Sequence, residues 1–249
     1  MRRLVVSVVV GLVALAGAVS ASSGAAAAPT VTGLVLSYQF EADTGQRARD
    51  SGPNAINATY VNTTAAEARV AGTERRGNSI ELVGADHEYL AVPERNALDV
   101  NRFTLAALVR YTGVENDQTL GRWEVMEKAG AYWMNVRTDG KVRVGGFFGG
   151  CTSKAWKYLD STVAVPIGTW THVAATYNGS KLTVWINGKA RGSTAVTGTT
   201  CKNDLPLAIG AKHNPDKGLL EAFWDGRLDD VRIYRRALTA SEIAVLVAG

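Results

Sequence analysis

The sequence predicts an all-β protein, a two-sheet antiparallel sandwich or jelly roll with one short helix at its C-terminus. Short runs of β-branched and aromatic residues alternate with Asn-Gly and Asp-Gly turn signals at close intervals, and helical periodicity is nearly absent. The 249 residues are 46% apolar, as in globular proteins. No internal repeat or linker follows Pro29, so we expect a single domain over residues 33–249.

Residues 1–28 are expected to form a secretory signal peptide. Arg2 and Arg3 precede an apolar segment at residues 4–19, and the small-residue run SASSGAAAAP follows it. This order is typical of a leader that is cleaved, here after Ala27 or Ala28. An uncleaved anchor is the alternative. Since no later apolar run is long enough to span a bilayer, we expect a secreted, extracellular protein without a membrane span.

Charge and cysteine content narrow the class further. The chain has 27 Lys and Arg against 23 Asp and Glu, and the leader contains two of the basic residues. The others are scattered, which argues against a nucleic-acid surface. In an exported chain Cys151 and Cys201 most simply form one disulfide, which would stabilise the fold by roughly 4 kcal/mol. Two free thiols are the alternative.

Tight-turn signals delimit several strands. Asp139-Gly140 separates AYWMNVR from KVRVGGFF, Asn178-Gly179 separates WTHVAATY from KLTVWI, and Asn187-Gly188 follows directly. Because these pairs favour hairpin turns, residues 170–194 are predicted to form a three-stranded meander. Runs bounded by Gly, Pro, Asn or Asp predict further strands at residues 34–40, 79–82, 89–92, 103–111, 125–129, 207–211 and 226–234.

The helix is predicted at the end of the chain. Thr239 can be its N-cap and Glu242 the third residue of a capping box. Leu238 and Ile243 occupy the two positions of a hydrophobic staple.

Three segments resemble those of secreted bacterial LamG-like, concanavalin A-like jelly-roll domains. They are LVLSYQFEADTGQRARDSGPNAINAT, GTWTHVAATYNGSKLTVWINGK and FWDGRLDDVRIYRRALTASEI, which together extend over nearly the whole mature chain. The resemblance implies two antiparallel sheets packed face to face, often a bound Ca²⁺, and often recognition of glycans or cell-surface ligands. It does not imply one activity, because the fold hosts lectins, carbohydrate-binding modules, glycanases, lyases and adhesion modules.

The sequence shows no recognisable catalytic motif. Glycanases of this type present carboxylates at alternate positions of one strand. Glu115 and Asp117 begin such a pattern, but Thr119 takes the third position. Glu124 and Glu127 are three residues apart and are therefore expected on opposite faces of their strand. The Gly-x-Ser-x-Gly motif and the histidine spacings of zinc sites are absent.

Acidic residues at the two ends of the domain predict a structural Ca²⁺ site. Glu41, Asp43 and Asp50 follow the first strand, and Asp229 and Asp230 lie on the last strand. Ca²⁺ takes six to eight oxygen ligands, so two or three of these carboxylates would be joined by carbonyls and water. In the resembling family the ion joins these two segments. Alternatively, Asp50 forms an Asx turn and Asp229 is a surface charge.

Exposed aromatic residues indicate a sugar-binding surface, since a sugar ring packs its C–H face on an indole or phenol. Trp156, Tyr158 and Trp224 are the expected platforms, and packing under loops is the alternative. Gly145 and Gly146 predict either a close approach by a ligand or a bend of the sheet. The polar partners expected near the platforms are Arg143, His213, Asn214 and Asp216.

We therefore predict a secreted, lectin-like module that binds a glycan or polysaccharide without modifying it. One alternative is a polysaccharide-active glycoside hydrolase or lyase of the same superfamily. Another is an extracellular adhesion module that binds a cell-surface protein.

Overall fold

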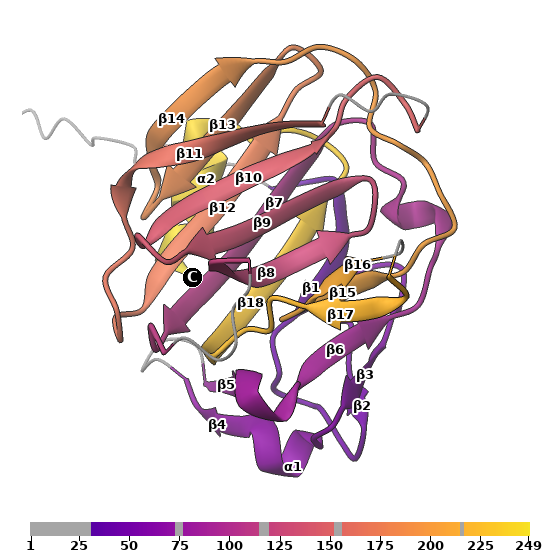
Figure 1. Cartoon of the computed structure of the whole chain (residues 1–249), viewed down its shortest axis with the longest axis vertical. Helices are drawn as coiled ribbons and strands as arrows, with labels where there is room; N and C mark the ends of the chain where they lie inside the picture. The colour runs from indigo at the N-terminus through magenta and orange to yellow at the C-terminus, as the bar shows by residue number, and fades with distance from the viewer. Residues whose placement is uncertain (1–30, 73–76, 115–119, 152–155, 215–216) are drawn as a thin grey trace, which may run out of the picture.

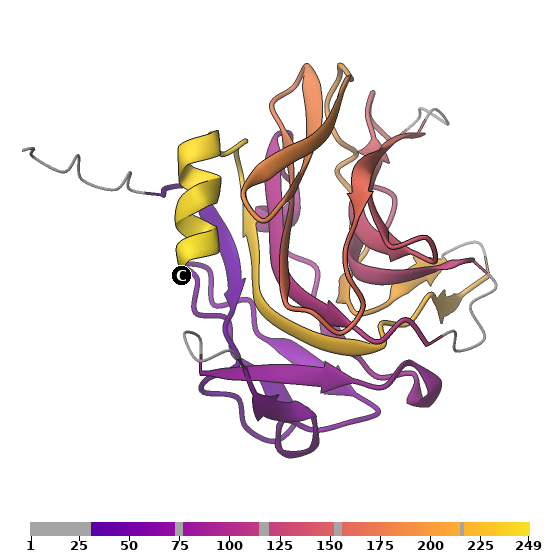
Figure 2. The ribbon, with the colours of Figure 1, turned by 90° about the vertical axis from the view of Figure 1, so that its left-hand side faces the viewer.

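The computed structural model describes residues 31–72, 77–114, 120–151, 156–214 and 217–249. The predicted signal peptide and Asp216 lie outside these residues. Two antiparallel sheets of eight strands pack face to face, as the two views of the ribbon show (Figures 1 and 2). The predicted all-β, concanavalin A-like sandwich is thereby confirmed.

The first sheet, called sheet A, is built around the last strand of the chain. Strand β18 pairs with β7, with β5 and with β1. In spatial order sheet A contains β14 (Lys189–Ala195), β13 (Lys181–Ile186), β12 (Thr171–Tyr177), β7 (Phe103–Tyr111), β18 (Gly226–Tyr234), β5 (Asn78–Leu82) and β4 (Arg69–Ala71), with β1 (Leu34–Tyr38) beside β18.

The second sheet, sheet B, includes the predicted hairpin at Asp139-Gly140. In spatial order it contains β11 (Trp156–Ala164), β10 (Lys141–Phe147), β9 (Tyr132–Arg137), β8 (Arg122–Lys128), β15 (Leu207–Ile209), β6 (Tyr89–Val92), β3 (Ala58–Val61) and β2 (Arg47–Ala48). A separate two-stranded sheet of β16 (Lys212–Asn214) and β17 (Leu219–Glu221) lies beside β8 and β15 (Figure 1).

The main core lies between the sheets. Its largest fully buried side chains are aromatic because few other residues can fill the space between two curved sheets. They include Tyr38, Phe103, Trp123, Tyr132 and Trp224.

Helix α2 (Ala240–Ala248) covers the outer side of sheet A (Figure 2). Its apolar residues pack with Ala106 and Ala174 of that sheet. The predicted capping box is present, since Thr239 N donates to Glu242 Oε2 at 2.9 Å and Glu242 N donates to Thr239 Oγ1 at 3.3 Å. Arg236 also pairs with Glu242, and this contact lowers the pKa of Glu242 to about 2.

Strands β6, β7 and β18 have the predicted bounds, and the three-stranded meander is β12, β13 and β14. Strand β11 and the short elements β2, β3, β4 and α1 (Ala65–Ala68) were not predicted from the sequence. Two 3₁₀ turns at Gly84–Asp86 and Asn96–Leu98 were not predicted either. Within the described ranges, no helix is long and apolar enough to cross a membrane.

Candidate functional site

A pocket of about 360 Å³ opens on the outer face of sheet B. Strands β8, β9, β10 and β11 form its base, and β16 borders it beside β8. A larger hollow of about 830 Å³ lies among loops that contain Asn96, Arg102 and Thr199, but none of the described residues that line it is aromatic. The smaller pocket is therefore the better candidate for a specific site.

Strand register places the lining side chains in rows across sheet B. In one row, Trp133 on β9 lies between Glu127 on β8 and Gly145 on β10. Gly145 in turn pairs with Tyr158 on β11. The pocket thus has acidic residues on the β8 side and aromatic residues toward β11.

A β-bulge in β8 places both glutamates on this outer face. The pairing of β8 with β9 shifts register between Glu124 and Met126. Val125 and Met126 both point into the core and are fully buried, so the alternation of faces restarts after them. The expectation that Glu124 and Glu127 lie on opposite faces is therefore wrong. In the sequence, the two consecutive apolar residues Val125 and Met126 between the acids could have indicated this bulge.

The two glutamates are buried but only partly hydrogen-bonded. Glu124 and Glu127 are 1% and 7% exposed. Asn135 Nδ2 donates to Glu124 Oε2 at 3.3 Å, and Arg122 Nε lies 3.6 Å from the same oxygen. Glu127 accepts a hydrogen bond from the backbone N–H of His213. Glu124 Oε1 and Glu127 Oε2 have no hydrogen-bond partner among the described residues.

Burial changes the acidity of this pair. Desolvation, followed by the charge of Glu127, raises the pKa of Glu124 well above its usual value. Desolvation also raises the pKa of Glu127 to about 7, against the opposing charges of Lys212 and Arg122. The pair is therefore partly protonated near neutral pH.

Among the described residues, three aromatic side chains line the pocket, Trp133 beside Glu127 and then Phe147 and Trp156, and Tyr158 stacks on Trp156 without lining the pocket itself. Trp156 and Tyr158 are 48% and 45% exposed and stack with their ring centroids 5.0 Å apart, which agrees with their predicted exposure. Trp133 lies 5.9 Å from Trp156 and 6.2 Å from Phe147 by the same measure. A β-carbon at Gly145 would collide with the indole of Trp133, so the glycine leaves room for this aromatic wall.

Two cations at the pocket are paired with acids beside it. Arg143 donates to Asp160 at 2.6 and 2.8 Å, and its guanidinium lies 4.0 Å from the centroid of Tyr158. Lys212 Nζ lies 2.8 Å from Glu221 Oε1.

Most of the predicted polar partners gather at the pocket, which Arg143, His213 and Asn214 all line. Asn214 Nδ2 donates to Glu221 Oε1 at 3.1 Å. Burial and the charge of Lys212 lower the pKa of His213, so its imidazole is neutral near pH 7.

Trp224 does not belong to this surface, and its prediction as an exposed platform is wrong. It is 0% exposed and lies in the core with Tyr111, whose ring centroid is 6.4 Å away. Its backbone N–H donates to Gly210 O at 2.8 Å, which ties this turn to the residue that follows β15. The large apolar indole turns inward, although the neighbouring FWDG sequence is typical of a turn.

The acids predicted to bind calcium have protein partners. Asp50 Oδ1 accepts from the backbone N–H groups of Ser37 and Gly52 at 2.8 and 2.7 Å, and Oδ2 accepts from that of Ile56 at 2.8 Å. Asp43 accepts from Arg49 N at 2.8 Å and from the hydroxyl of Tyr60 at 2.6 Å. These contacts support the Asx-turn alternative for Asp50.

The remaining predicted ligands are also engaged. Glu41 accepts two hydrogen bonds from Asn78, and Asp230 pairs with Arg232. Asp229 Oδ1 accepts from the backbone N–H of Asp230 at 2.6 Å. Over the described ranges, no group of three or more His, Cys, Asp or Glu side chains is arranged to hold a metal ion.

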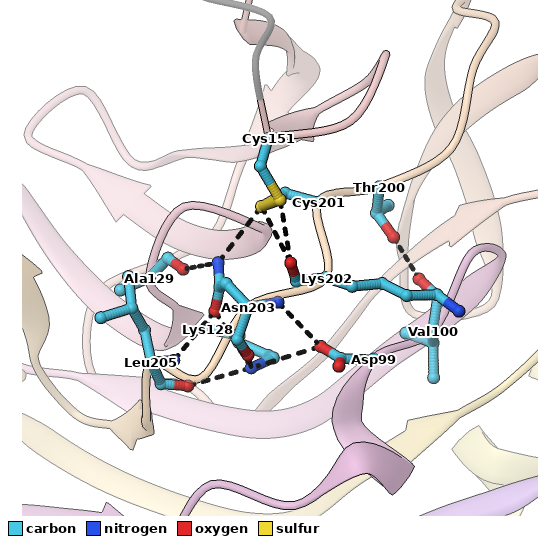
Figure 3. Close-up of a disulfide and its surroundings, with 10 residues drawn as sticks. All are labelled: Asp99, Val100, Lys128, Ala129, Cys151, Thr200, Cys201, Lys202, Asn203 and Leu205. Atoms are coloured by element: carbon cyan, nitrogen blue, oxygen red, sulfur yellow. Dashed lines mark hydrogen bonds and ion pairs between the residues drawn. A yellow bond between two sulfur atoms is a disulfide. The ribbon is translucent and has the colours of Figure 1, made fainter.

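The predicted disulfide is confirmed, with 2.01 Å between the sulfurs of Cys151 and Cys201. Figure 3 shows the hydrogen bonds that connect it to Ala129, in the turn that follows β8. Asn203 Nδ2 donates to Cys201 Sγ at 3.4 Å and to Ala129 O at 2.9 Å. The fully buried Lys128 donates to the carbonyls of Asn203 and Leu205 at 2.8 and 2.9 Å. This network fixes the turn between β8 and β9, and hence the strands of Glu127 and Trp133.

Several solved structures share this fold. The binding domain of Paraclostridial Mosquitocidal Protein 1 matches with a TM-score of 0.62 and 18% identity, over 86% of this chain and 52% of that one. Domain 4 of a GH43 extracellular arabinanase from Geobacillus stearothermophilus, solved with arabinotriose, matches with a TM-score of 0.60 and 19% identity, over 86% and 98%. The receptor binding domain of botulinum neurotoxin D matches with a TM-score of 0.60 and 14% identity, over 87% and 52%.

The chain thus spans about half the length of these toxin domains and nearly all of the arabinanase domain. No curated protein matches the sequence. The profile of the concanavalin A-like lectin/glucanases superfamily, Laminin_G_3, matches residues 84–244, which include every strand that forms the base of the pocket. By this match, and by its two packed antiparallel sheets, the chain belongs to the concanavalin A-like lectin/glucanases superfamily.

Proposed function

We propose that the pocket on sheet B binds a carbohydrate and that the protein is a secreted glycan-binding module. One observation carries this proposal: an exposed aromatic wall faces buried carboxylate oxygens that have no partner among the described residues. A sugar presents complementary surfaces, because its C–H face packs on aromatic rings while its hydroxyls need hydrogen-bond partners.

The polar base of the pocket supports ligand binding rather than a purely structural role. A buried polar atom without a partner costs stability, typically about 1–3 kcal/mol. Glu124 Oε1 and Glu127 Oε2 are two such atoms in one pocket. Hydroxyl groups of a bound sugar would donate to both oxygens and relieve this cost.

Two proteins of similar fold interact with sugars, and this supports the proposal. A structure of the similar arabinanase domain holds arabinotriose. Another similar structure belongs to botulinum neurotoxin type C, whose cell entry depends on interaction with two ganglioside molecules. Domains of this fold therefore interact with sugars in other proteins. We extend that property to this chain because its own pocket has suitable chemistry.

The test is a glycan-array and polysaccharide-binding screen on the mature protein, followed by titration of each ligand found. We expect Trp156→Ala and Glu124→Gln each to weaken binding about tenfold or more, because each removes one half of the site. Ile167→Ala is the matched surface control, since Ile167 is 62% exposed and does not line the pocket. Unchanged binding in both pocket variants would place the sugar elsewhere, and capture of a protein that sugars do not displace would favour an adhesion module.

Hydrolysis is a second candidate function, and one observation favours it. Glu124 and Glu127 share a face, and both have a raised pKa, so one can hold a proton while the other is ionised. In a hydrolysis, the protonated carboxyl would donate its proton to the glycosidic oxygen as the bond to the sugar carbon breaks, and the ionised carboxylate would take a proton from the water that adds to this carbon. Release of reducing ends that Glu127→Gln abolishes would establish this activity; binding without release would support the module.

Secretion and structural calcium are proposals that need their own measurements. Mass spectrometry of the exported protein should give a chain that begins after Ala27 or Ala28. Calcium binding would raise the melting temperature progressively, with the logarithm of the ion concentration above the Kd, and EDTA would reverse the rise. A melting temperature that does not respond to either reagent would contradict a stabilising calcium site.

A further inference from the structure

We infer that the pocket selects a neutral, hydroxyl-rich sugar unit and discriminates against sugars that carry a carboxylate or an ammonium group. This inference rests on the proposed function and narrows it to a class of ligand. It follows from the charges at the pocket, the hydrogen-bonding groups left available there, and the aromatic wall.

The cations that line the pocket already have acidic neighbours. Arg143 is held by Asp160, and Lys212 is held by Glu221, each at hydrogen-bond distance. Neither cation is therefore an unpaired charge that would attract an anionic ligand. Arg122 is the third lining cation, and it faces the two glutamates.

The glutamate pair is balanced by the charges around it. Glu124 and Glu127 on β8 share their surroundings with Arg122 on the same strand, Asn135 on β9, Arg143 on β10, and Lys212 and His213 on β16. Burial raises the pKa of both carboxyls, which limits the negative charge of the pair, and Arg122 opposes the charge that remains. A charged group on a ligand would therefore lose its hydration in this buried site without meeting an unpaired opposite charge.

The hydrogen-bonding groups left available suit hydroxyls. Glu124 Oε1 and Glu127 Oε2 accept no hydrogen bond from a described residue, and Arg122 Nε, although 3.6 Å from Glu124 Oε2, is a buried donor that makes no hydrogen bond with one. A sugar hydroxyl donates one hydrogen bond and accepts others. Neighbouring hydroxyls can therefore satisfy both carboxylates and the guanidinium, whereas a ligand carboxylate lacks the donor that the two glutamates need.

The aromatic wall completes the selection. Trp133, which neighbours Glu127 across the strands, lines the pocket together with Phe147 and Trp156, and these rings can pack against the apolar face of a sugar ring. The volume of about 360 Å³ is near the lower end of the range of small-molecule pockets, roughly 300–1,000 Å³. The pocket thus suits a short sugar segment rather than a long stretch of polymer.

The experiment compares neutral and charged oligosaccharides on the mature wild-type protein by calorimetric titration at pH 7. The neutral probes are arabino-, xylo-, manno-, cello- and galacto-oligosaccharides. The charged probes are mannuronate, galacturonate and glucosamine oligosaccharides, which include counterparts of the manno- and cello-series with the same linkage. We expect at least one neutral series to bind about tenfold or more tightly than every charged probe.

Variants show whether the glutamates cause this preference. Glu124→Gln and Glu127→Gln should each weaken binding of the neutral ligand about tenfold and reduce its margin over uronates, because each replaces an acceptor oxygen by an amide nitrogen that can donate to a ligand carboxylate. Glu81→Gln is the matched control, since Glu81 pairs with Arg227 on sheet A and does not line the pocket. Thermal unfolding of each variant verifies that it is folded.

The outcomes are distinguishable. Equal or tighter binding of a uronate or glucosamine probe would overturn the inference but leave the proposed glycan-binding function intact. Neutral preference that survives both glutamine substitutions would also overturn it, because the selection would then arise elsewhere. Failure of every sugar to bind would overturn the proposed function and the inference together.

Discussion

Two pairs of buried acids behave differently in this molecule. Asp43 and Asp50, in the turn that follows β1, direct their oxygens at backbone N–H groups and at the hydroxyl of Tyr60. Glu124 and Glu127, at the pocket, each keep one oxygen without a partner among the described residues. The first pair is satisfied by the fold itself, while the second pair is not.

The difference separates a structural carboxylate from one available to a ligand. Burial alone does not distinguish them, since all four side chains are almost inaccessible to solvent. What distinguishes them is whether the surrounding residues supply every hydrogen bond. Acids with a complete set stabilise the fold, and acids with an incomplete set are candidates for function.

The largest expected effect on stability comes from removing the disulfide, whose hydrogen-bonded neighbours support the pocket. Replacing both Cys151 and Cys201 by alanine should lower the free energy of unfolding by roughly 4 kcal/mol, because the disulfide closes a loop with a separation of 50 residues. Sugar binding should weaken as well, since the hydrogen bonds of Asn203 lose their anchor. Urea unfolding measures the first effect and titration the second. Full stability in the variant would show that the neighbouring Lys128 network suffices.

The next largest effect on stability is expected at Asp50, an acid whose oxygens all accept hydrogen bonds from the fold. Asp50→Asn should cost about 3 kcal/mol, because an amide nitrogen would face a backbone N–H that now donates to a carboxylate oxygen. Sugar affinity should stay unchanged, as Asp50 does not line the pocket. Urea unfolding of Asp50→Asn is compared with that of the exposed control Asp86→Asn. A cost below that of the control would contradict a structural role.

Replacing an acid that lacks a complete set of hydrogen bonds is expected to stabilise the protein rather than destabilise it. The folded protein raises the pKa of Glu127 from 4.5 to about 7. Folding therefore disfavours the ionised carboxylate, and the wild type loses stability as the pH rises from about 4.5 through 7. Glu127→Gln should therefore be more stable than the wild type by on the order of 2 kcal/mol at pH 8, with little difference at pH 4. Urea unfolding across this pH range measures the effect. A variant less stable than the wild type at pH 8 would show that the carboxylate is satisfied after all.

The smallest stability effect concerns the mouth of the pocket. Asp160→Asn leaves Arg143 without its carboxylate partner, yet both side chains are partly exposed, so stability should change by less than about 1 kcal/mol. Affinity for galacturonate oligosaccharides should rise, because an unpaired guanidinium then borders the site. Unchanged uronate affinity would mean that Arg143 does not reach the ligand.

Much of the fold could be predicted from local signals. The Asn-Gly and Asp-Gly turns, the runs of β-branched residues and the Thr239 capping box identify their elements without knowledge of the tertiary structure. Strand β11 was missed because it is a partly exposed strand at the edge of sheet B, whose lysines and aromatics lack a buried face with strong alternation.

The site was predicted only in part, and for a physical reason. Exposure of Trp156 and Tyr158 followed from their polar neighbours, and Arg143, His213 and Asn214 gather at the same pocket. Trp224 was misassigned because the sequence cannot show to which side a turn directs a large side chain. The glutamates were missed because a period of two was assumed along β8, whereas the bulge breaks that period.

The bulge in β8 also has an evolutionary consequence. One additional residue in a strand changes which side chains reach the surface beyond that point, without changing any of their identities. A strand can therefore gain or lose a polar surface by a change in length alone. In a family whose members share a scaffold but differ in ligands, single insertions and deletions in sheet B are then as informative about specificity as substitutions.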